Sequence, residues 1–442
     1  MGNSPILGIL TGVESRAITV VQSRCAKVRN RNVECLKCAA ACTTGCISLV
    51  GDELVVDASK CVGCGTCATV CPTCALESRN PTDAELLSEC RARRKDDTVA
   101  IACSQLAAAL EGKADPCAFA RVVCLGRADE SLLVALAADG VKEISLACGD
   151  CGRCEQQHGR DTALLVAETA DTLLRAWGSD ARVEVVDGAP AGMLADGVSE
   201  AAARAAVEDY FSVLRACERI APDAGKAQAD GAPGAPGGAD APDADLSDAA
   251  EDADADCGEG QQAAEAPAQV RDELPAFAFA GHQKADELQP GLLRVMKDGT
   301  LPHFIPDRRD RLLGALARLG QPVEETISTR LWGCVVIDGE KCSSCRMCAT
   351  FCPTGAISKF DDEDGTFGVF HLPGDCVKCG SCRDICPEDA ILLLDDVKAP
   401  YLMDGAVHRY TMRPREVEIG QPHQILDTMR TVLKDAPNLY ER

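Results

Sequence analysis

The sequence has few aromatic residues and too few basic residues to balance its acids. Aromatic side chains make up 3% of the 442 residues, so any core must be built mainly from aliphatic side chains. Lys and Arg number 45 against 69 Asp and Glu, which gives a formal net charge of −24. Because nucleic acids and anionic membrane surfaces are bound by basic faces, neither is expected as a partner.

Long apolar runs and nucleotide-binding motifs are also missing. No apolar stretch approaches the roughly 18 residues of a membrane span, and no charged-then-apolar leader opens the chain. The sequence has no P-loop, no G-x-G-x-x-G after a predicted strand, and no flavin or pterin motif. No nucleophile–base constellation stands out either. We therefore expect a cytoplasmic protein without direct membrane insertion, and a non-catalytic subunit rather than an enzyme in its own right.

Cysteine, by contrast, is abundant, with 28 residues concentrated in three stretches of the chain. In a short secreted chain this number would indicate a disulfide framework. A long chain without a leader fits reduced thiols better, most of them bound to metal.

An acidic segment divides the chain. From Asp223 to Glu265 there are twelve acidic residues against one basic residue, Lys226, and almost no large apolar side chain. Such a composition cannot bury enough surface to fold, so residues 221–267 are predicted to be a disordered acidic linker. An acidic docking tail for a basic partner is the alternative. The remaining predicted units span residues 1–95, 96–220 and 268–442.

Three stretches repeat the motif C-x2-C-x2-C-x3-C-P, beginning at Cys61, Cys342 and Cys376. Three thiolates two residues apart lie on one tight loop and can bind three corners of an iron–sulfur cubane. The fourth cysteine leads into a helix and reaches a neighbouring cluster. Tetrahedral zinc is the alternative, but zinc sites do not favour such triplets followed by Cys-Pro.

These motifs resemble the bacterial two-cluster ferredoxins, and the resemblance implies α+β ferredoxin-like units, each with two [4Fe–4S] clusters and crossed ligation. Between the two C-terminal motifs, ISKFDDEDGTFGVFHL is predicted to form a β-hairpin with Asp364 and Gly365 in the turn. The implied ligands of one C-terminal cluster are Cys342, Cys345, Cys348 and Cys386. Those of the other are Cys376, Cys379, Cys382 and Cys352.

The N-terminal unit departs from the family pattern. Its first loop offers only Cys35, Cys38 and Cys42, and the nearest candidate for the missing thiol is Cys25, across the insertion AKVRNRNVE. Thr43 also replaces the usual proline. We assign one cluster to Cys25, Cys35, Cys38 and Cys71. The other is assigned to Cys61, Cys64, Cys67 and Cys42.

The middle segment alternates strand-like and helix-like stretches. Predicted strands at 98–105, 120–126, 143–154 and 182–188 are separated by amphipathic helical stretches, which indicates a small α/β domain with a parallel sheet. Because ligands bind at the carboxyl ends of parallel strands, cysteines there are candidates for one metal site. They are Cys103, Cys124, Cys148, Cys151 and Cys154. Ordinary buried cysteines are the alternative.

This segment resembles the delta subunit of methyl-viologen-reducing hydrogenases. The resemblance rests on CLGRAD at 124–129, ADGV at 138–141, and ACGDC followed by HG at 147–159. It implies a [2Fe–2S] cluster on Cys103, Cys124, Cys148 and Cys151. Because Cys154 is an additional thiol, a further [4Fe–4S] cluster is the alternative.

Clusters with four thiolate ligands have no open coordination position and therefore suit electron transfer. The sequence thus predicts an electron-transfer subunit that relays electrons between a catalytic oxidoreductase subunit, such as a flavoprotein or hydrogenase, and another carrier. Two alternatives stay open, an electron-transfer subunit of a molybdopterin oxidoreductase and a cluster-based redox sensor.

Overall fold

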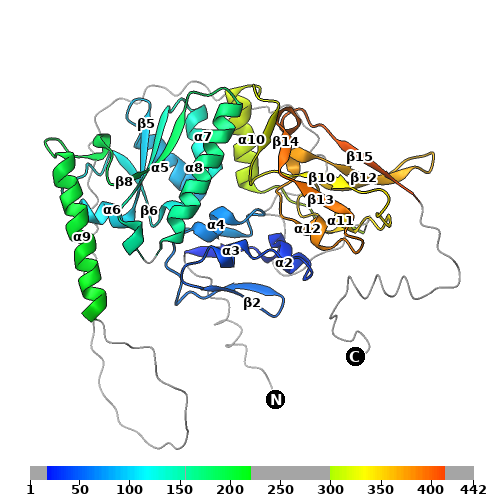
Figure 1. Cartoon of the computed structure of the whole chain (residues 1–442), viewed down its shortest axis with the longest axis horizontal. Helices are drawn as coiled ribbons and strands as arrows, with labels where there is room; N and C mark the ends of the chain where they lie inside the picture. Colours follow the sequence, from blue (N-terminus) through cyan, green and yellow to red (C-terminus); the bar gives the residue numbers. More distant parts are fainter. Residues whose placement is uncertain (1–16, 155, 221–298, 414–442) are drawn as a thin grey trace, which may run out of the picture.

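The computed structural model describes residues 17–154, 156–220 and 299–413 (Figure 1). We call 17–95 the head unit, 96–220 the middle unit and 299–413 the C-terminal unit. The predicted acidic linker at 221–267 lies outside the described residues.

The head unit contains two small antiparallel sheets and several short helices. Strand β1 pairs with β4, and β2 pairs with β3. Helix α5 begins with a capping box, in which Thr82 and Glu85 satisfy each other's backbone amides. The elements are β1 Ile18–Val20, α2 Ala26–Arg29, α3 Lys37–Ala40, β2 Ile47–Val50, β3 Glu53–Val56, α4 Thr66–Val70, β4 Leu76–Ser78 and α5 Asp83–Ala92.

The middle unit is built on a four-stranded parallel sheet in the order β6-β5-β7-β8, so the predicted parallel sheet is confirmed. Helix α7 is apolar on nearly every side, and it is buried because α5, α8 and α10 pack around it. Its elements are β5 Thr98–Cys103, α6 Ser104–Ala109, β6 Phe119–Val122, α7 Glu130–Ala138, β7 Glu143–Cys148, α8 His158–Ala176, β8 Arg182–Asp187 and α9 Glu200–Ile220.

The C-terminal unit repeats the plan of the head unit and adds strands to it. Strand β10 pairs with β13, and the predicted hairpin of β11 and β12 forms with Gly365 in its turn at φ 84°. Strand β15 extends this hairpin, and β9 pairs with β14. The elements are α10 Asp307–Leu319, β9 Thr326–Ser328, β10 Cys334–Ile337, α11 Met347–Thr350, β11 Ile357–Asp361, β12 Phe367–His371, α12 Ser381–Asp384, β13 Ile391–Leu394, β14 Asp396–Lys398 and β15 His408–Met412.

Helix α10 joins the C-terminal unit to the middle unit (Figure 1). Its residues Leu312 and Leu316 are buried in the same apolar core as Leu133 of α7 and Leu86 of α5. The three units therefore pack together as one body, with elements of both outer units completing the middle core. The predicted unit boundaries remain predictions, since nothing tests where each unit would fold alone.

Among the described residues, no helix combines the length and apolar character that crossing a membrane requires.

Candidate metal centres

The eight predicted ligands of the C-terminal unit form two groups of thiols. Cys348 lies within electrostatic range of Cys342, Cys345 and Cys386. Burial, followed by the charges of these neighbours, raises its pKa to about 12. In the second group, Cys382 lies near Cys376, Cys379 and Cys352, and burial raises its pKa well above the ordinary value. The crossed arrangement implied by the ferredoxin resemblance is thus the arrangement of these side chains in space.

The head unit gathers its thiols in the same crossed way, including the unusual one. Cys38 lies near Cys25, Cys35 and Cys71, and burial, then the charges of these thiols, raises its pKa to about 12. Cys25 reaches this group because α2, formed by part of the insertion, starts directly after it.

The second head group surrounds Cys67, which lies near Cys61, Cys64 and Cys42. Burial, followed by the charge of Cys64, raises its pKa. A further thiol stands beside this group, because Cys46 Sγ is 3.4 Å from Cys42 Sγ. Cys46 occupies the position of Ala356 in the C-terminal motif, so nothing in the repeat predicts it as a ligand.

The cluster loops share one backbone conformation. In the three full motifs the residues on either side of the second cysteine have positive φ, as at Gly63 and Gly65. The same conformation is adopted by Ser344 and Arg346 in the next motif, and by Lys378 and Gly380 in the last. Residues with positive φ turn the chain tightly, so the loop's amides can face a bound anion or cluster sulfur. The loop at Cys35 lacks this conformation, as expected from its shorter motif; Leu36, for example, has φ −137°.

Backbone donors and crowded thiols both fit a polynuclear metal group. The amide of Ala75 donates to Cys71 Sγ at 3.3 Å, and that of Ala390 donates to Cys386 Sγ at 3.4 Å. Four thiolates in one buried group repel one another, so only a bound cation makes the ionised set stable. Cys42, Cys71, Cys352 and Cys386 come from the other motif of their unit, so each group contains four thiols.

A buried arginine of the head unit lies beside thiols of the C-terminal unit. Arg29 lies within electrostatic range of Cys352 and Cys379, and burial lowers its pKa to about 10 while these two thiols oppose the shift. Its Nε and Nη2 atoms are buried without a hydrogen-bond partner among the described residues. Its Nη1 donates to Ser23 O at 3.2 Å, and two unpaired guanidinium nitrogens beside thiols suit a negatively charged cluster.

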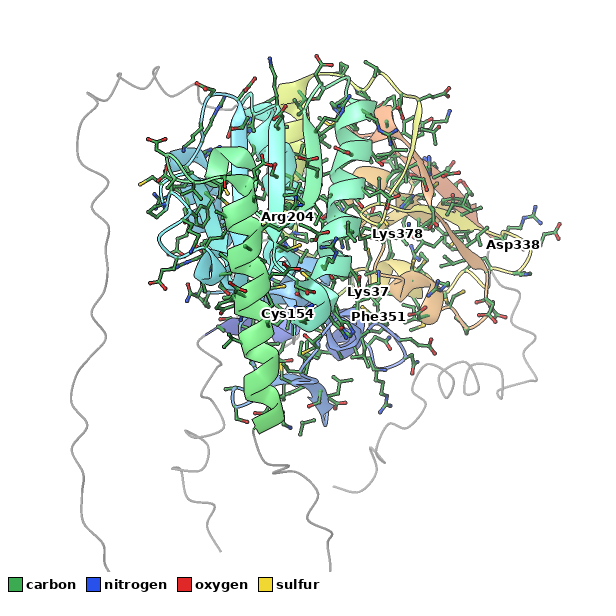
Figure 2. The ribbon with its side chains drawn as sticks, turned by 60° about the vertical axis from the view of Figure 1, so that its left-hand side comes forward. Lys37, Cys154, Arg204, Asp338, Phe351 and Lys378 are labelled. Atoms are coloured by element: carbon green, nitrogen blue, oxygen red, sulfur yellow. The ribbon has the colours of Figure 1, made fainter. Side chains whose placement is uncertain are left out.

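Apolar contacts close the same junction. Ala26 and Val33 of the head unit pack with Ile385 and Phe351 of the C-terminal unit. The Glu34 amide also donates to Asp384 Oδ2 at 3.1 Å. Figure 2 shows Lys37 and Phe351, one from each unit, in this central region.

The head and middle units also bring thiols together. Cys124 of the middle unit lies within electrostatic range of Cys64 of the head, and burial raises its pKa to about 12. One glycine permits the close approach, because a Cβ on Gly126 would overlap Thr66 of the head. Within the middle unit, a Cβ on Gly159 would overlap Cys124 Sγ.

The five middle thiols lie at one edge of the parallel sheet. Cys103 and Cys148 end strands β5 and β7, and Cys124 follows β6. Cys124 lies near Cys103 and Cys154, and Cys103 lies near Cys151. The predicted convergence of strand ends is therefore present. The structure does not single out four of the five as a ligand set.

Cys148 and Cys151 differ from the other thiols of the middle unit because charged side chains contact them. Arg160 Nη1 donates to Cys148 Sγ at 2.9 Å, and Asp187 Oδ1 lies 3.5 Å from the same sulfur. A hydrogen bond from Cys148, then the Arg160 guanidinium, lowers the pKa of Cys151 to about 7. Cys151, Arg160 and Asp187 line a pocket of about 490 Å³ that α9 borders. Cys151 is thus both ionisable and accessible, whereas Cys148 is buried, and its hydrogen bond to Cys151 followed by burial raises its pKa.

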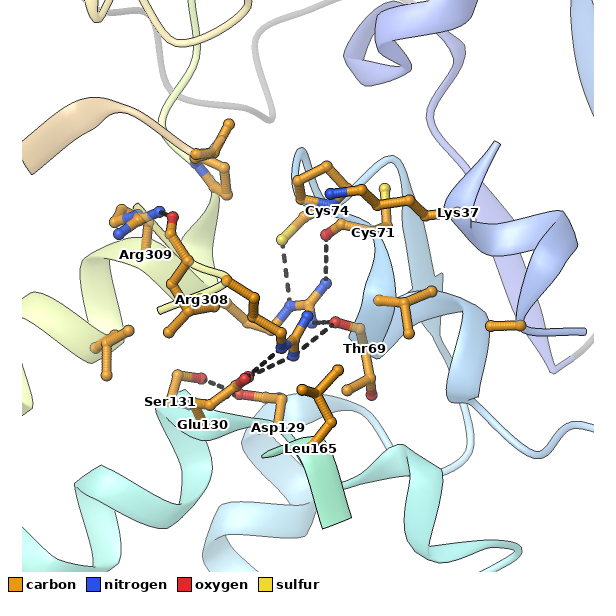
Figure 3. A pocket seen from close by; sticks show the side chains of 18 of the residues that line it. Lys37, Thr69, Cys71, Cys74, Asp129, Glu130, Ser131, Leu165, Arg308 and Arg309 are labelled. Atoms are coloured by element: carbon orange, nitrogen blue, oxygen red, sulfur yellow. Dashed lines mark hydrogen bonds and ion pairs between the residues drawn. The ribbon is translucent and has the colours of Figure 1, made fainter. Parts of the chain in front are cut away.

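A second pocket, of about 450 Å³, lies where the three units meet (Figure 3). Arg308 of α10 extends into the head unit, where its Nε donates to Cys74 Sγ at 3.2 Å and its Nη2 to Cys71 O at 3.4 Å. Arg330 pairs with the buried Glu130 at 2.6 Å. Sequence reasoning missed Arg29 and Arg308, because nothing in their local sequence shows which cysteines the fold brings beside them.

Comparison with known families covers two parts of the chain. Residues 341–390 match the 4Fe-4S dicluster domain family, and residues 54–77 match the 4Fe-4S binding domain family. No curated protein and no solved structure matches. No family match covers the middle unit, so its resemblance to a hydrogenase subunit has no support from these comparisons. The chain therefore has 4Fe-4S ferredoxin-type domains near both ends, which imply at least two [4Fe–4S] clusters and, in general, electron transfer.

Proposed function

We propose that this protein is the electron-transfer subunit of an oxidoreductase complex, with four [4Fe–4S] clusters and one further cluster in the middle unit. The ligands would be the four thiol groups of the head and C-terminal units, as assigned from the sequence. When bound, these clusters would supply one-electron transfer.

The observation that carries the proposal is the continuity of the thiol groups across three units. Cys348 and Cys382 connect the two C-terminal groups electrostatically, and Cys38 and Cys67 connect the two head groups. Arg29 spans the junction between the outer units. At the other end, Cys64 approaches Cys124. A linear series of redox groups through a protein is what a relay requires, whereas a storage or scaffold function needs no such series.

For the middle unit we propose a cluster at the sheet edge. The resemblance to the hydrogenase delta subunit favours [2Fe–2S] on Cys103, Cys124, Cys148 and Cys151, and the presence of Cys154 nearby keeps [4Fe–4S] as the alternative. The pocket beside Cys151 would be the place where a partner's redox group approaches, because it opens at the end of the series.

The partner would be a catalytic subunit, such as a flavoprotein or hydrogenase, whose basic face complements the net charge of −24. The α/β unit between the two ferredoxin units speaks against the molybdopterin-type subunit, which resembles this chain in cluster count only. A cytoplasmic location and the unit boundaries at 95, 220 and 267 belong to the same proposal.

Anaerobic purification from the native host tests this function most directly. The expected result is a stable complex with an oxidoreductase subunit that reduces or oxidises the clusters within its turnover time. Clusters that are lost readily, in a protein that no partner enzyme reduces, would contradict the relay and favour a redox sensor.

A further inference from the structure

Three side chains outside the thiol groups converge in the C-terminal unit. Sγ of Cys334 and a ring nitrogen from each of His371 and His408 all lie within 4.8 Å of one another. They come from three different strands, β10, β12 and β15. None of them belongs to a ferredoxin motif. Among the described residues, none of them forms a hydrogen bond with a cysteine assigned to a cluster.

Strand pairing explains why the three residues meet. His371 and His408 are directly opposite each other in the antiparallel β12–β15 pair, so their side chains share one face. The hydroxyl of Tyr410, two residues after His408, donates to Val335 O at 2.6 Å, which attaches β15 to β10 beside Cys334. Trp332 Nε1 donates to Gly374 O at 3.1 Å and fixes the start of β10 near the end of β12.

His371 is the second, independent indication of a ligand. Its side chain is fully buried, at 0% exposure. Neither ring nitrogen has a hydrogen-bond partner among the described residues. Buried polar atoms are almost always paired, so two unpaired nitrogens in one buried imidazole need an explanation. A metal ion at the point of convergence would provide a partner for the nitrogen that faces Cys334 and His408.

The donor spacing fits tetrahedral coordination. Zinc bonds of about 2.3 Å to sulfur and 2.05 Å to nitrogen, at a tetrahedral angle, place the two donors about 3.6 Å apart. The distance from Cys334 Sγ to His408 Nδ1 is 3.7 Å. The ring of Tyr401 contacts His408 edge-on, with centroids 5.6 Å apart, and so restricts the orientation of this imidazole.

We infer that Cys334, His371 and His408 form a binding site for one zinc ion, separate from the iron–sulfur centres. One sulfur and two imidazole nitrogens are the donors that zinc prefers, and three protein ligands leave a fourth position. Cys334 and His408 are only partly buried, so water or a small thiol or carboxylate ligand can reach that position. The inference rests on these three strands and does not depend on the proposed relay.

Zinc binding to the intact, cluster-loaded protein is the test. Protein freed of zinc is titrated with zinc chloride against a chromophoric chelator, and the bound ion is examined by zinc K-edge X-ray absorption, which iron does not obscure. We expect one zinc per chain, with one sulfur near 2.3 Å and two nitrogens near 2.0–2.1 Å.

Cys334→Ala and His408→Ala should each weaken zinc binding more than about 100-fold, since even removal of an outer partner of a metal ligand costs 10–100-fold. Iron and sulfide contents should stay unchanged, which shows that the unit remains folded. His158→Ala, an exposed histidine on α8, is the matched control and should bind zinc normally.

Three results would overturn the inference. One is an affinity for zinc in the unmodified protein that is no higher than that of His408→Ala. It would make the Cys334–His408 contact an ordinary hydrogen bond. Another is a shell of four sulfurs, which would place zinc in a cluster loop. The third is a zinc shell with fewer than two nitrogens near 2.0–2.1 Å beside its sulfur, which would remove a histidine from the site.

Discussion

In the ferredoxin units, three cysteines of each thiol group come from one short loop or from the segment just before it. The fourth cysteine comes from the other motif of the same unit. The middle unit instead collects its thiols from separate strand ends and the loop that follows β7. The first arrangement depends on local sequence and tight turns, and the spacing of the cysteines indicates it. The second depends on the order of strands in the sheet. The comparison teaches that a group of thiols can be assembled either from local cysteine spacing or from the order of strands in a sheet.

The two kinds of site also differ in their surroundings. Backbone amides approach the ferredoxin thiols Cys71 and Cys386, whereas Arg160 and Asp187 contact Cys148 in the middle unit. Charged neighbours and the pocket beside Cys151 give a partner's redox group a place to approach the middle edge. We therefore expect the ferredoxin clusters to be the stable part of the series and the middle cluster to be the one that exchanges electrons with a partner.

The largest effect should come from removing a ferredoxin ligand. Cys382→Ser should eliminate one [4Fe–4S] cluster and lower electron transfer through the chain more than about 100-fold, because a member of the series is missing. Iron and acid-labile sulfide analysis and low-temperature EPR would measure the loss. Cys90→Ala is the control, since Cys90 is buried in the apolar core and belongs to no assigned ligand set. Full iron content in Cys382→Ser would refute its assignment.

A middle-unit cysteine should behave differently. Cys103→Ala or Cys124→Ala should remove one spectroscopic signal and leave every ferredoxin signal intact, because these thiols lie outside both ferredoxin units. Cys154→Ala sharpens the comparison. Retention of the signal in Cys154→Ala would favour the set with Cys148 and Cys151, and its loss would favour Cys154 as a ligand. If all signals survive in Cys103→Ala and Cys124→Ala, no cluster exists at this edge.

Packing around Cys124 inside the middle unit should give an intermediate effect. Gly159→Ala places a Cβ against Cys124 Sγ, so we expect a loss of about 1–3 kcal/mol in the free energy of unfolding, as for other overpacked sites. Thermal or urea unfolding of the anaerobic protein would measure it. Gly192→Ala is the control, because a Cβ there meets nothing within 4 Å. Equal stabilities of the two variants would contradict the close approach at Cys124.

The smallest effect should be a change of reduction potential. Arg308→Gln removes a cation that donates to Cys74 Sγ and Cys71 O. A unit charge at about 8 Å with an effective dielectric constant near 20 contributes about 2 kcal/mol, so the potential of the adjacent head cluster should fall by roughly 50–100 mV. Redox titration followed by EPR would detect the shift. Arg318→Gln, on the exposed part of α10, should leave all potentials unchanged.

Much of this architecture could be predicted from the sequence, and the failures have a physical cause. The cysteine spacing predicts the cluster loops, and alternating strands and helices predict the parallel sheet, because both signals are local. The crossed fourth member of each thiol group is implied by the resemblance to ferredoxins. The assignment of Cys25 to the first head group could also be predicted, because no other thiol lies near the first loop in the sequence. What sequence reasoning could not predict are contacts between distant segments. These include Arg29 beside Cys352, Arg308 beside Cys74, and His371 opposite His408, all of which depend on how the units and strands pack.

The most direct test of the relay is magnetic interaction between clusters in the fully reduced protein. EPR spectra of the intact protein and of Cys379→Ser, recorded under the same reducing conditions, would be compared in the region of the head-unit signals. If the C-terminal and head groups are neighbouring redox centres, the intact protein shows head-cluster signals broadened and split by spin–spin coupling, and the variant shows them simplified. Head-unit signals that are identical in both proteins would contradict a continuous series of clusters.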